Sequence, residues 1–157
     1  MEDILSEVDS VRYATTLGTN ALIEHNGPRI GMLVTAGFES TVVLSRGRGY
    51  GEGLDILGKN NMPDAQRPAP LVLPHMIEGV RERLDFEGKL VMPLDENDVR
   101  HKIRKLADKG AQIIVICFVN SVVNPEHEKR VEQILLEEYP SHLLGAIPVI
   151  LSHRVAG

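Results

Sequence analysis

The most constraining feature of this sequence is a continuous apolar run, Ile-Ile-Val-Ile-Cys-Phe-Val, at residues 113–119. A run of this length without polar alternation is typical of a strand buried on both faces of a parallel sheet. A helix is predicted on each side of it. The first begins at Asp95 as N-cap, and the second begins with Asn124 as cap and Pro125 at its first position. Apolar residues recur at helical spacing in both helices: Val99, Ile103, Leu106 and Ala107 in the first, and Val131, Ile134 and Leu135 in the second.

The N-terminal half gives a second strand–helix–strand pattern. We predict a strand over Val11–Thr16, a helix over Thr19–His25 and a buried strand over Arg29–Thr35. A turn at Ala36-Gly37 and a short helix over Phe38–Leu44 follow. The predicted fold class is therefore α/β, with partly parallel sheet or sheets and flanking helices.

The middle of the chain differs from both halves. Residues 45–75 are rich in glycine and proline and predict a long loop. Ile77–Leu84 and Lys89–Met92 predict two strands around a turn, and Ile147–Ser152 predicts the last strand. We expect one partial domain over 1–157, with an α/β unit at 11–44, a Gly/Pro-rich excursion and strands at 45–92, and a second α/β unit at 93–157. The two α/β units form either one sheet or two small subdomains.

Composition excludes several classes of protein. The net charge is −5 and aromatic residues make up 4% of the 157 residues, which disfavours nucleic-acid binding. The only cysteine, Cys117, lies in the apolar run, so no disulfide within the chain is possible. Residues 1–10 do not resemble a signal peptide, and no apolar run is long enough to cross a membrane. We expect a cytoplasmic protein.

The candidate binding residues precede the first predicted helix. Thr15, Thr16, Thr19 and Asn20 bring hydroxyls and a carboxamide to a strand–helix junction, where phosphate or a polarised carbonyl binds well. Gly18 would let a ligand approach the backbone. The alternative is that these side chains only cap the helix.

Two other motifs give weaker evidence for a binding or catalytic site. The glycine array at residues 47–53 does not form a dinucleotide fingerprint. It predicts either an active-site lid or a plain mobile loop, with Arg46 and Arg48 as candidate anion contacts. Asn124, His127 and Glu128 lack the spacing of a metal site and are interpreted as a helix start, and His153 shows no ligand spacing. The residues alone assemble no catalytic constellation, so the catalytic residues stay unknown and no metal ligand is predicted.

Several segments resemble one known family, the hydantoinase/oxoprolinase family. They lie at residues 14–24, 27–38, 82–85, 93–95, 117–130 and 152–155. The resemblance implies the N-terminal lobe of an actin/sugar-kinase/heat-shock-type ATPase. It also implies ATP and Mg²⁺ or another divalent ion in the full assembly, with a small-molecule substrate. By motif position it places Thr15, Thr16, Thr19, Asn20 and Arg46 in the nucleotide or substrate cleft.

Two departures shape the functional expectation. The family's acidic phosphate loop, Asp-x-Gly-Gly-Thr, is absent, and the chain ends at Gly157 where the family continues. We therefore expect a fragment that is inactive alone and needs a missing ATPase lobe or a second subunit, in a homo- or hetero-oligomer. The expected reaction is ATP-dependent carbonyl activation for cyclic amide hydrolysis. The alternatives are an acetone- or acetophenone-type ketone carboxylase subunit and a non-catalytic assembly subunit.

Overall fold

A computed structural model describes residues 16–24, 27–44, 54–61, 70–140 and 146–156. Its centre is a four-stranded sheet in the order β2-β1-β5-β6. The strands are β1 (Ile30–Thr35), β2 (Ile77–Val80), β5 (Ile113–Cys117) and β6 (Val149–Leu151). Every pairing in this sheet is parallel. The predicted α/β fold class is confirmed, and strands from both halves of the chain share one sheet.

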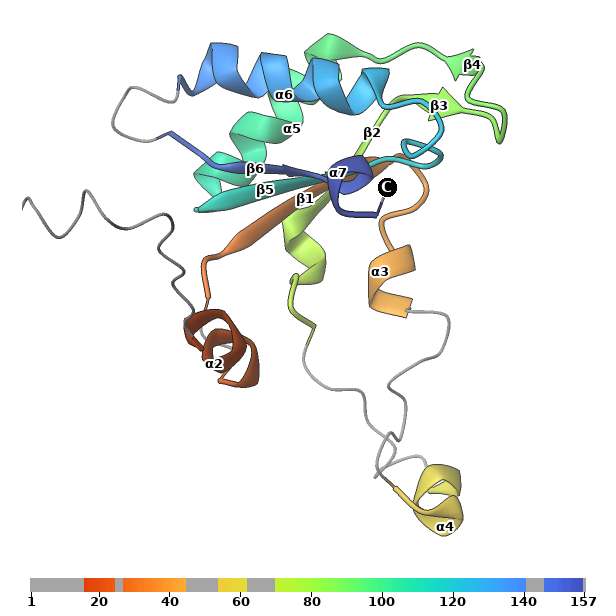
Figure 1. Cartoon of the computed structure of the whole chain (residues 1–157), viewed down its shortest axis with the longest axis vertical. Helices are drawn as coiled ribbons and strands as arrows, with labels where there is room; N and C mark the ends of the chain where they lie inside the picture. Colours follow the sequence, from red (N-terminus) through yellow and green to blue (C-terminus); the bar gives the residue numbers. More distant parts are fainter. Residues whose placement is uncertain (1–15, 25–26, 45–53, 62–69, 141–145, 157) are drawn as a thin grey trace, which may run out of the picture.

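Helices lie on both sides of this sheet, and the short helix at residues 56–60 stands away from it (Figure 1). The longest are α5 (Glu96–Asp108) and α6 (Glu126–Glu138). The short helices are α2 (Leu17–Ile23), α3 (Thr41–Leu44), α4 (Ile56–Asn60), the 3₁₀ turn η2 (Pro74–Met76) and α7 (Ser152–Ala156). A separate antiparallel hairpin consists of β3 (Arg83–Leu84) and β4 (Leu90–Met92).

The main core lies between the sheet and the helices α5 and α6. Alternate strand residues point to this face, as the pleat requires. They pack against the apolar stripes predicted for the two helices, and the whole cluster is buried. Its members include Leu33, Ile114, Ile116, Leu151, Val99, Ile103, Leu106, Val131, Ile134 and Leu135.

The opposite face of the sheet carries a smaller cluster. Met32, Val34 and Ile77 are buried there, with Val43 of α3 packed against them. Figure 1 shows α5 and α6 on one side of the sheet and α3 on the other. The chain therefore leaves β1 towards one face and leaves β5 towards the opposite face. Adjacent parallel strands that diverge in this way open a crevice at their carboxyl ends, where α/β proteins bind ligands.

The predicted strand over residues 77–84 needs correction. Ile77–Leu84 is not one strand, because β2 ends at Val80 and the antiparallel hairpin begins at Arg83. Glu82 lies in the break, and its side chain is buried against β1 and α6 instead of continuing the ladder. The predicted hairpin turn is present, with Gly88 in a left-handed conformation (φ 78°).

Other boundaries differ by a few residues. Helix α2 begins two residues before the predicted Thr19, with the Asn20 amide bonded to the Thr16 carbonyl at 2.8 Å. Residues 11–15 of the predicted first strand lie outside the described residues. Within Phe38–Leu44 only Thr41–Leu44 is helical, and Ser152, predicted to end the last strand, begins α7. Pro125 is the N-cap of α6, although Asn124 Oδ1 still accepts a bond from the Glu126 amide at 3.1 Å.

Candidate active site

The carboxyl edge of the sheet holds a buried carboxylate bonded to an imidazole. Glu82 follows β2, and its side chain has no exposed surface. His127 lies in the first turn of α6, and its Nδ1 is 2.8 Å from Glu82 Oε2. The histidine side chain keeps 13% of its surface exposed, so it can be reached from solvent. A buried acid that orients a reachable imidazole is an arrangement used for proton transfer.

The last residue of β1 fixes the second oxygen of this carboxylate. Thr35 is buried, and its hydroxyl donates to Glu82 Oε1. The same Thr35 oxygen accepts a bond from the Val119 amide, just beyond β5, at 3.0 Å. The Glu82–His127 pair is therefore attached to both β1 and β5. It lies where these two strands diverge, which is the expected place for a ligand crevice.

The loop after β5 is shaped to support this edge. Asn120 adopts a left-handed conformation (φ 63°), which asparagine tolerates better than most residues. Its Nδ2 donates to the Leu84 carbonyl at 3.1 Å, and Asn124 Nδ2 donates to the Gly88 carbonyl at 2.9 Å. These two amides hold the β3–β4 hairpin against the loop that leads into α6.

A second carboxylate–imidazole pair lies beside the first. Glu128, the residue after His127, is fully buried. Its oxygens accept bonds from His153 Nδ1 at 2.6 Å, from the Ser152 hydroxyl at 2.6 Å, and from the amides of Phe118 at 3.0 Å and His153 at 3.2 Å. Burial alone raises the pKa of Glu128, but the bonds from Ser152, His153 and the two amides outweigh it, and the net pKa is lowered.

The neighbouring thiol is a poor nucleophile. Cys117, at the end of β5, is half-buried, and burial raises its pKa. The nearby Glu128 charge also raises it, while a bond from Ser152 opposes the effect only in part. Ser121 and Ser152 share a hydroxyl–hydroxyl bond of 3.1 Å. Together these groups fasten the start of α7 to the start of α6 and to the chain that follows β5, and we interpret the second pair as an anchor.

The predicted site residues lie elsewhere or outside the described residues. Thr16, Thr19 and Asn20 are exposed at and within α2, while Thr15 and Arg46 fall outside the described residues. Helix α2 leads into the amino end of β1. The carboxyl end of that six-residue strand is about 17 Å away at 3.3 Å per residue. The nucleotide role of the Thr15–Asn20 turn therefore stays a prediction.

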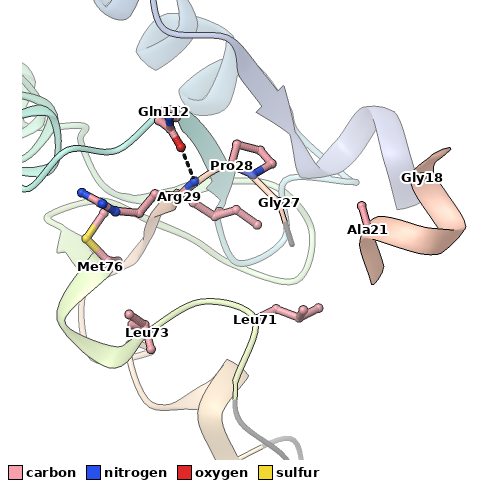
Figure 2. A pocket seen from close by; sticks show the side chains of 10 residues that line it. Gly18, Ala21, Gly27, Pro28, Arg29, Leu71, Leu73, Met76 and Gln112 are labelled. Atoms are coloured by element: carbon pink, nitrogen blue, oxygen red, sulfur yellow. Dashed lines mark hydrogen bonds between the residues drawn. The ribbon is translucent and has the colours of Figure 1, made fainter. Parts of the chain in front are cut away.

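A pocket of about 500 Å³ opens beside α2, at the amino edge of the sheet. Figure 2 shows its lining, in which the Arg29 backbone amide donates to Gln112 Oε1 at 2.8 Å. Most lining side chains are apolar or small, including Ala21, Leu71 and Leu73. The pocket lies at the opposite edge from the Glu82–His127 pair. We take the pair as the candidate active site because it holds the buried, hydrogen-bonded titratable groups.

The sequence contained only a weak signal for this site. His127 and Glu128 were interpreted as a helix start, and no rule of spacing joins them to Glu82 or His153 along the chain. The available signal was the buried-strand pattern, because residues that follow neighbouring parallel strands meet at one edge. In the described part of the chain, no group of three or more His, Cys, Asp or Glu residues could hold a metal ion.

No helix among the described residues is long and apolar enough to cross a membrane.

Comparison with known proteins identifies the chain's relatives. Residues 2–139 match the family described as the hydantoinase/oxoprolinase N-terminal region. The acetophenone carboxylase gamma subunit of Aromatoleum aromaticum is 43% identical over 155 residues, which is 99% of this chain and 21% of that protein.

Two solved structures share the fold. Nucleotide-free acetone carboxylase aligns with a TM-score of 0.76 and 32% identity over 86% of this chain and 19% of that one. The ATP-dependent caprolactamase of Pseudomonas jessenii aligns with a TM-score of 0.74 and 29% identity over 90% of this chain and 19% of that one. The chain spans about a fifth of the length of each of these three relatives. With its motifs, its parallel sheet and these matches in agreement, the chain belongs to the hydantoinase/oxoprolinase family and corresponds to its N-terminal region.

Proposed function

We propose that this chain forms part of an ATP-dependent enzyme that activates a carbonyl group by phosphorylating its oxygen. The observation that carries the proposal is the Glu82–His127 pair at the carboxyl ends of β1 and β5, with Nδ1 and Oε2 2.8 Å apart. Such chemistry needs a group that can move a proton near the carbonyl while ATP supplies the phosphoryl group. The names of two structural relatives, an ATP-dependent carboxylase and an ATP-dependent lactam hydrolase, support the use of ATP.

Ketone carboxylation is the favoured reaction. The sequence motifs put cyclic amide hydrolysis first, but the identity to the acetophenone carboxylase gamma subunit is 43%, against 31% to caprolactamase subunit alpha. In the favoured reaction, a phosphorylated enol of the ketone would react with an activated form of bicarbonate. Cyclic amide hydrolysis remains the second candidate, supported by the fold shared with caprolactamase.

The complete reaction would require more than the described residues. We propose that Mg²⁺ or another divalent ion binds with the phosphates of ATP, and that its protein ligands lie in another region or subunit. We also propose that a second lobe or subunit supplies the main phosphate-binding loop. A non-catalytic assembly role is the alternative, and it predicts that the Glu82–His127 pair can be removed without loss of turnover.

The test uses the natural full-length protein that contains this sequence, purified with the subunits that accompany it. ATP hydrolysis is measured with acetophenone or acetone plus bicarbonate, with 5-oxoproline, and with caprolactam. Ketone-dependent hydrolysis that also requires bicarbonate is the expected result. Hydrolysis stimulated only by the cyclic amides would replace carboxylation by the second candidate. Stimulation by none of the carbonyl compounds would reject the proposed function.

A further inference from the structure

The Glu82–His127 pair leaves one imidazole nitrogen available for chemistry. We propose that His127 is the catalytic base that removes a proton from the substrate atom next to the carbonyl, and that Glu82 and Thr35 are its positioning residues. The inference rests on the proposed function. It defines the substrate class as carbonyl compounds with a removable proton on the neighbouring atom, such as a ketone methyl group or a lactam N–H.

The hydrogen-bond partner fixes which nitrogen is free. A carboxylate only accepts hydrogen bonds, so the proposal assigns the imidazole proton to Nδ1, which lies 2.8 Å from Glu82 Oε2. The lone pair is then on Nε2. Among the described residues, Nε2 of His127 has no hydrogen-bond partner, and 13% of the side chain is exposed. The ring therefore has an accessible basic atom of defined orientation.

The carboxylate that orients the ring is itself held in place. Thr35 at the end of β1 donates to Oε1, which leaves Oε2 for the imidazole. The Val119 amide bonds to the Thr35 hydroxyl oxygen at 3.0 Å, so the hydroxyl hydrogen is directed at Glu82. Each member of the chain Val119–Thr35–Glu82–His127 thus orients the next. A base oriented by a third group is the general pattern of activated proton transfer.

Comparison with the second pair, Glu128 and His153, favours His127 as the catalytic base. Glu128 accepts bonds from two backbone amides, a serine hydroxyl and His153 Nδ1, and these bonds join β5, α6 and α7. That set accounts for Glu128 and His153 as an anchor of the chain. Glu82 receives no backbone amide among the described residues, and its two partners are both side chains, Thr35 and His127.

The proposed step is balanced as follows. Nε2 of His127 takes the proton from the atom next to the carbonyl carbon, and the electron pair of that bond forms the new double bond. The carbonyl π pair moves to oxygen, which bonds to the γ-phosphorus of ATP as the bond to ADP breaks. The products are an enol phosphate, or an imidate phosphate for a lactam, with ADP and a protonated imidazole. The buried Glu82 carboxylate stabilises the positive ring.

The test compares variants of the full-length protein with its accompanying subunits. We expect H127Q to lower the rate of carbonyl-dependent ATP hydrolysis by about 10²–10⁴-fold, the usual contribution of general base catalysis. E82Q should lower kcat by at least about tenfold with little change in KM, because the ring loses its tautomer control. The matched control is H101Q, which removes an exposed histidine on α5 and should retain wild-type turnover.

Two further measurements separate proton transfer from a structural role. Added imidazole should restore at least about tenfold of the lost rate in H127A, whose missing ring leaves room for it, and should not help H127Q. Exchange of the C–H protons next to the carbonyl of a ketone substrate with D₂O should stop in H127Q and continue in H101Q. Thermal unfolding of each variant identifies any that fail to fold, and E82Q then provides the test.

The outcomes distinguish two failures. A wild-type protein without carbonyl-dependent ATP hydrolysis overturns the proposed function, and this inference falls with it. A wild-type protein that turns over, with H127Q and E82Q equally active, overturns only the role of His127. Loss of turnover in H127Q without imidazole rescue of H127A, and with substrate exchange intact, assigns the pair a structural role and also overturns the inference.

Discussion

At the scale of single residues, three buried glutamates define which distant segments of the chain contact one another. Glu78, Glu82 and Glu128 are buried, and each is matched by donors from a different part of the chain. Burial of a carboxylate is costly without such donors, so each one specifies which segments must meet. Glu78 differs from the other two because its donors are lysines.

Glu78 predicts an acid-sensitive contribution to stability. Its carboxylate contacts Lys105 and Lys109 at 2.8 Å and Lys102 at 3.4 Å. Burial raises its pKa, but the lysine bonds and charges outweigh this and lower the pKa to about 2 from 4.5. Because the folded pKa is the lower one, the stabilisation is complete above about pH 4.5 and is lost as the pH falls towards 2.

The measurement is urea unfolding of the chain at pH 6 and pH 3. The wild type should lose on the order of 2 kcal/mol more of its unfolding free energy than E78Q across this interval. E87Q removes an exposed carboxylate of the hairpin and is the matched control, which should follow the wild type. Equal acid sensitivity of E78Q and wild type would show that the lysine cluster contributes nothing.

At the scale of elements, capping residues separate helices that support the core from helices that do not. Asp95 Oδ1 accepts the Asp98 amide at 3.0 Å at the start of α5, whose stripe is fully buried. Asp55 makes the same contact with the Gly58 amide at 2.7 Å, but α4 buries no residue.

These two caps give a paired prediction. Asp95→Ala should lower the unfolding free energy by about 1 kcal/mol, since loss of the cap weakens a helix that the core requires. Asp55→Ala removes an equivalent bond and should leave global stability within about 0.5 kcal/mol of wild type, because α4 can fray independently. Chemical denaturation of the two variants measures both values. Equal losses would mean that α4 unfolds together with the core.

The helices and strands also show how much of the fold could be predicted from the sequence. Long apolar runs and caps located β5, α5 and α6 within one or two residues, because local propensity and burial agree there. The predicted end of β2 was wrong. The apolar pattern around Glu82 does not indicate that its carboxylate bonds to Thr35, 47 residues earlier. The two carboxylate–imidazole pairs were missed for the same reason, since long-range polar contacts leave no periodic pattern.

At the scale of the whole molecule, the β3–β4 hairpin presents apolar side chains to solvent. Phe86 in its turn is 79% exposed, and Leu90, Val91 and Met92 are exposed along β4. Successive strand residues point to opposite sides, so β4 is uncovered on both. Exposed apolar groups gathered on one element are typical of surfaces that associate.

We therefore predict that the 157-residue chain binds the dye ANS and self-associates at high concentration. Replacing Phe86 and Val91 by serine should reduce dye fluorescence and shift sedimentation towards the monomer, because both changes remove apolar surface without disturbing a buried group. The control replaces Leu57, an exposed residue of α4, by serine. A wild-type chain that sediments as a monomer without binding dye would contradict this prediction.

The position of His127 and Glu128 in one helical turn has a mechanical consequence. Helix α6 is about 20 Å long, and its far end is held to α5 by the contacts of Glu138 with Arg104 at 2.7 Å and with Arg100 at 3.1 Å. Between these ends, a buried apolar stripe seats the helix on the core. Because one rigid helix carries both His127 and Glu128, a change in how α6 sits on the core would disturb both imidazole contacts together.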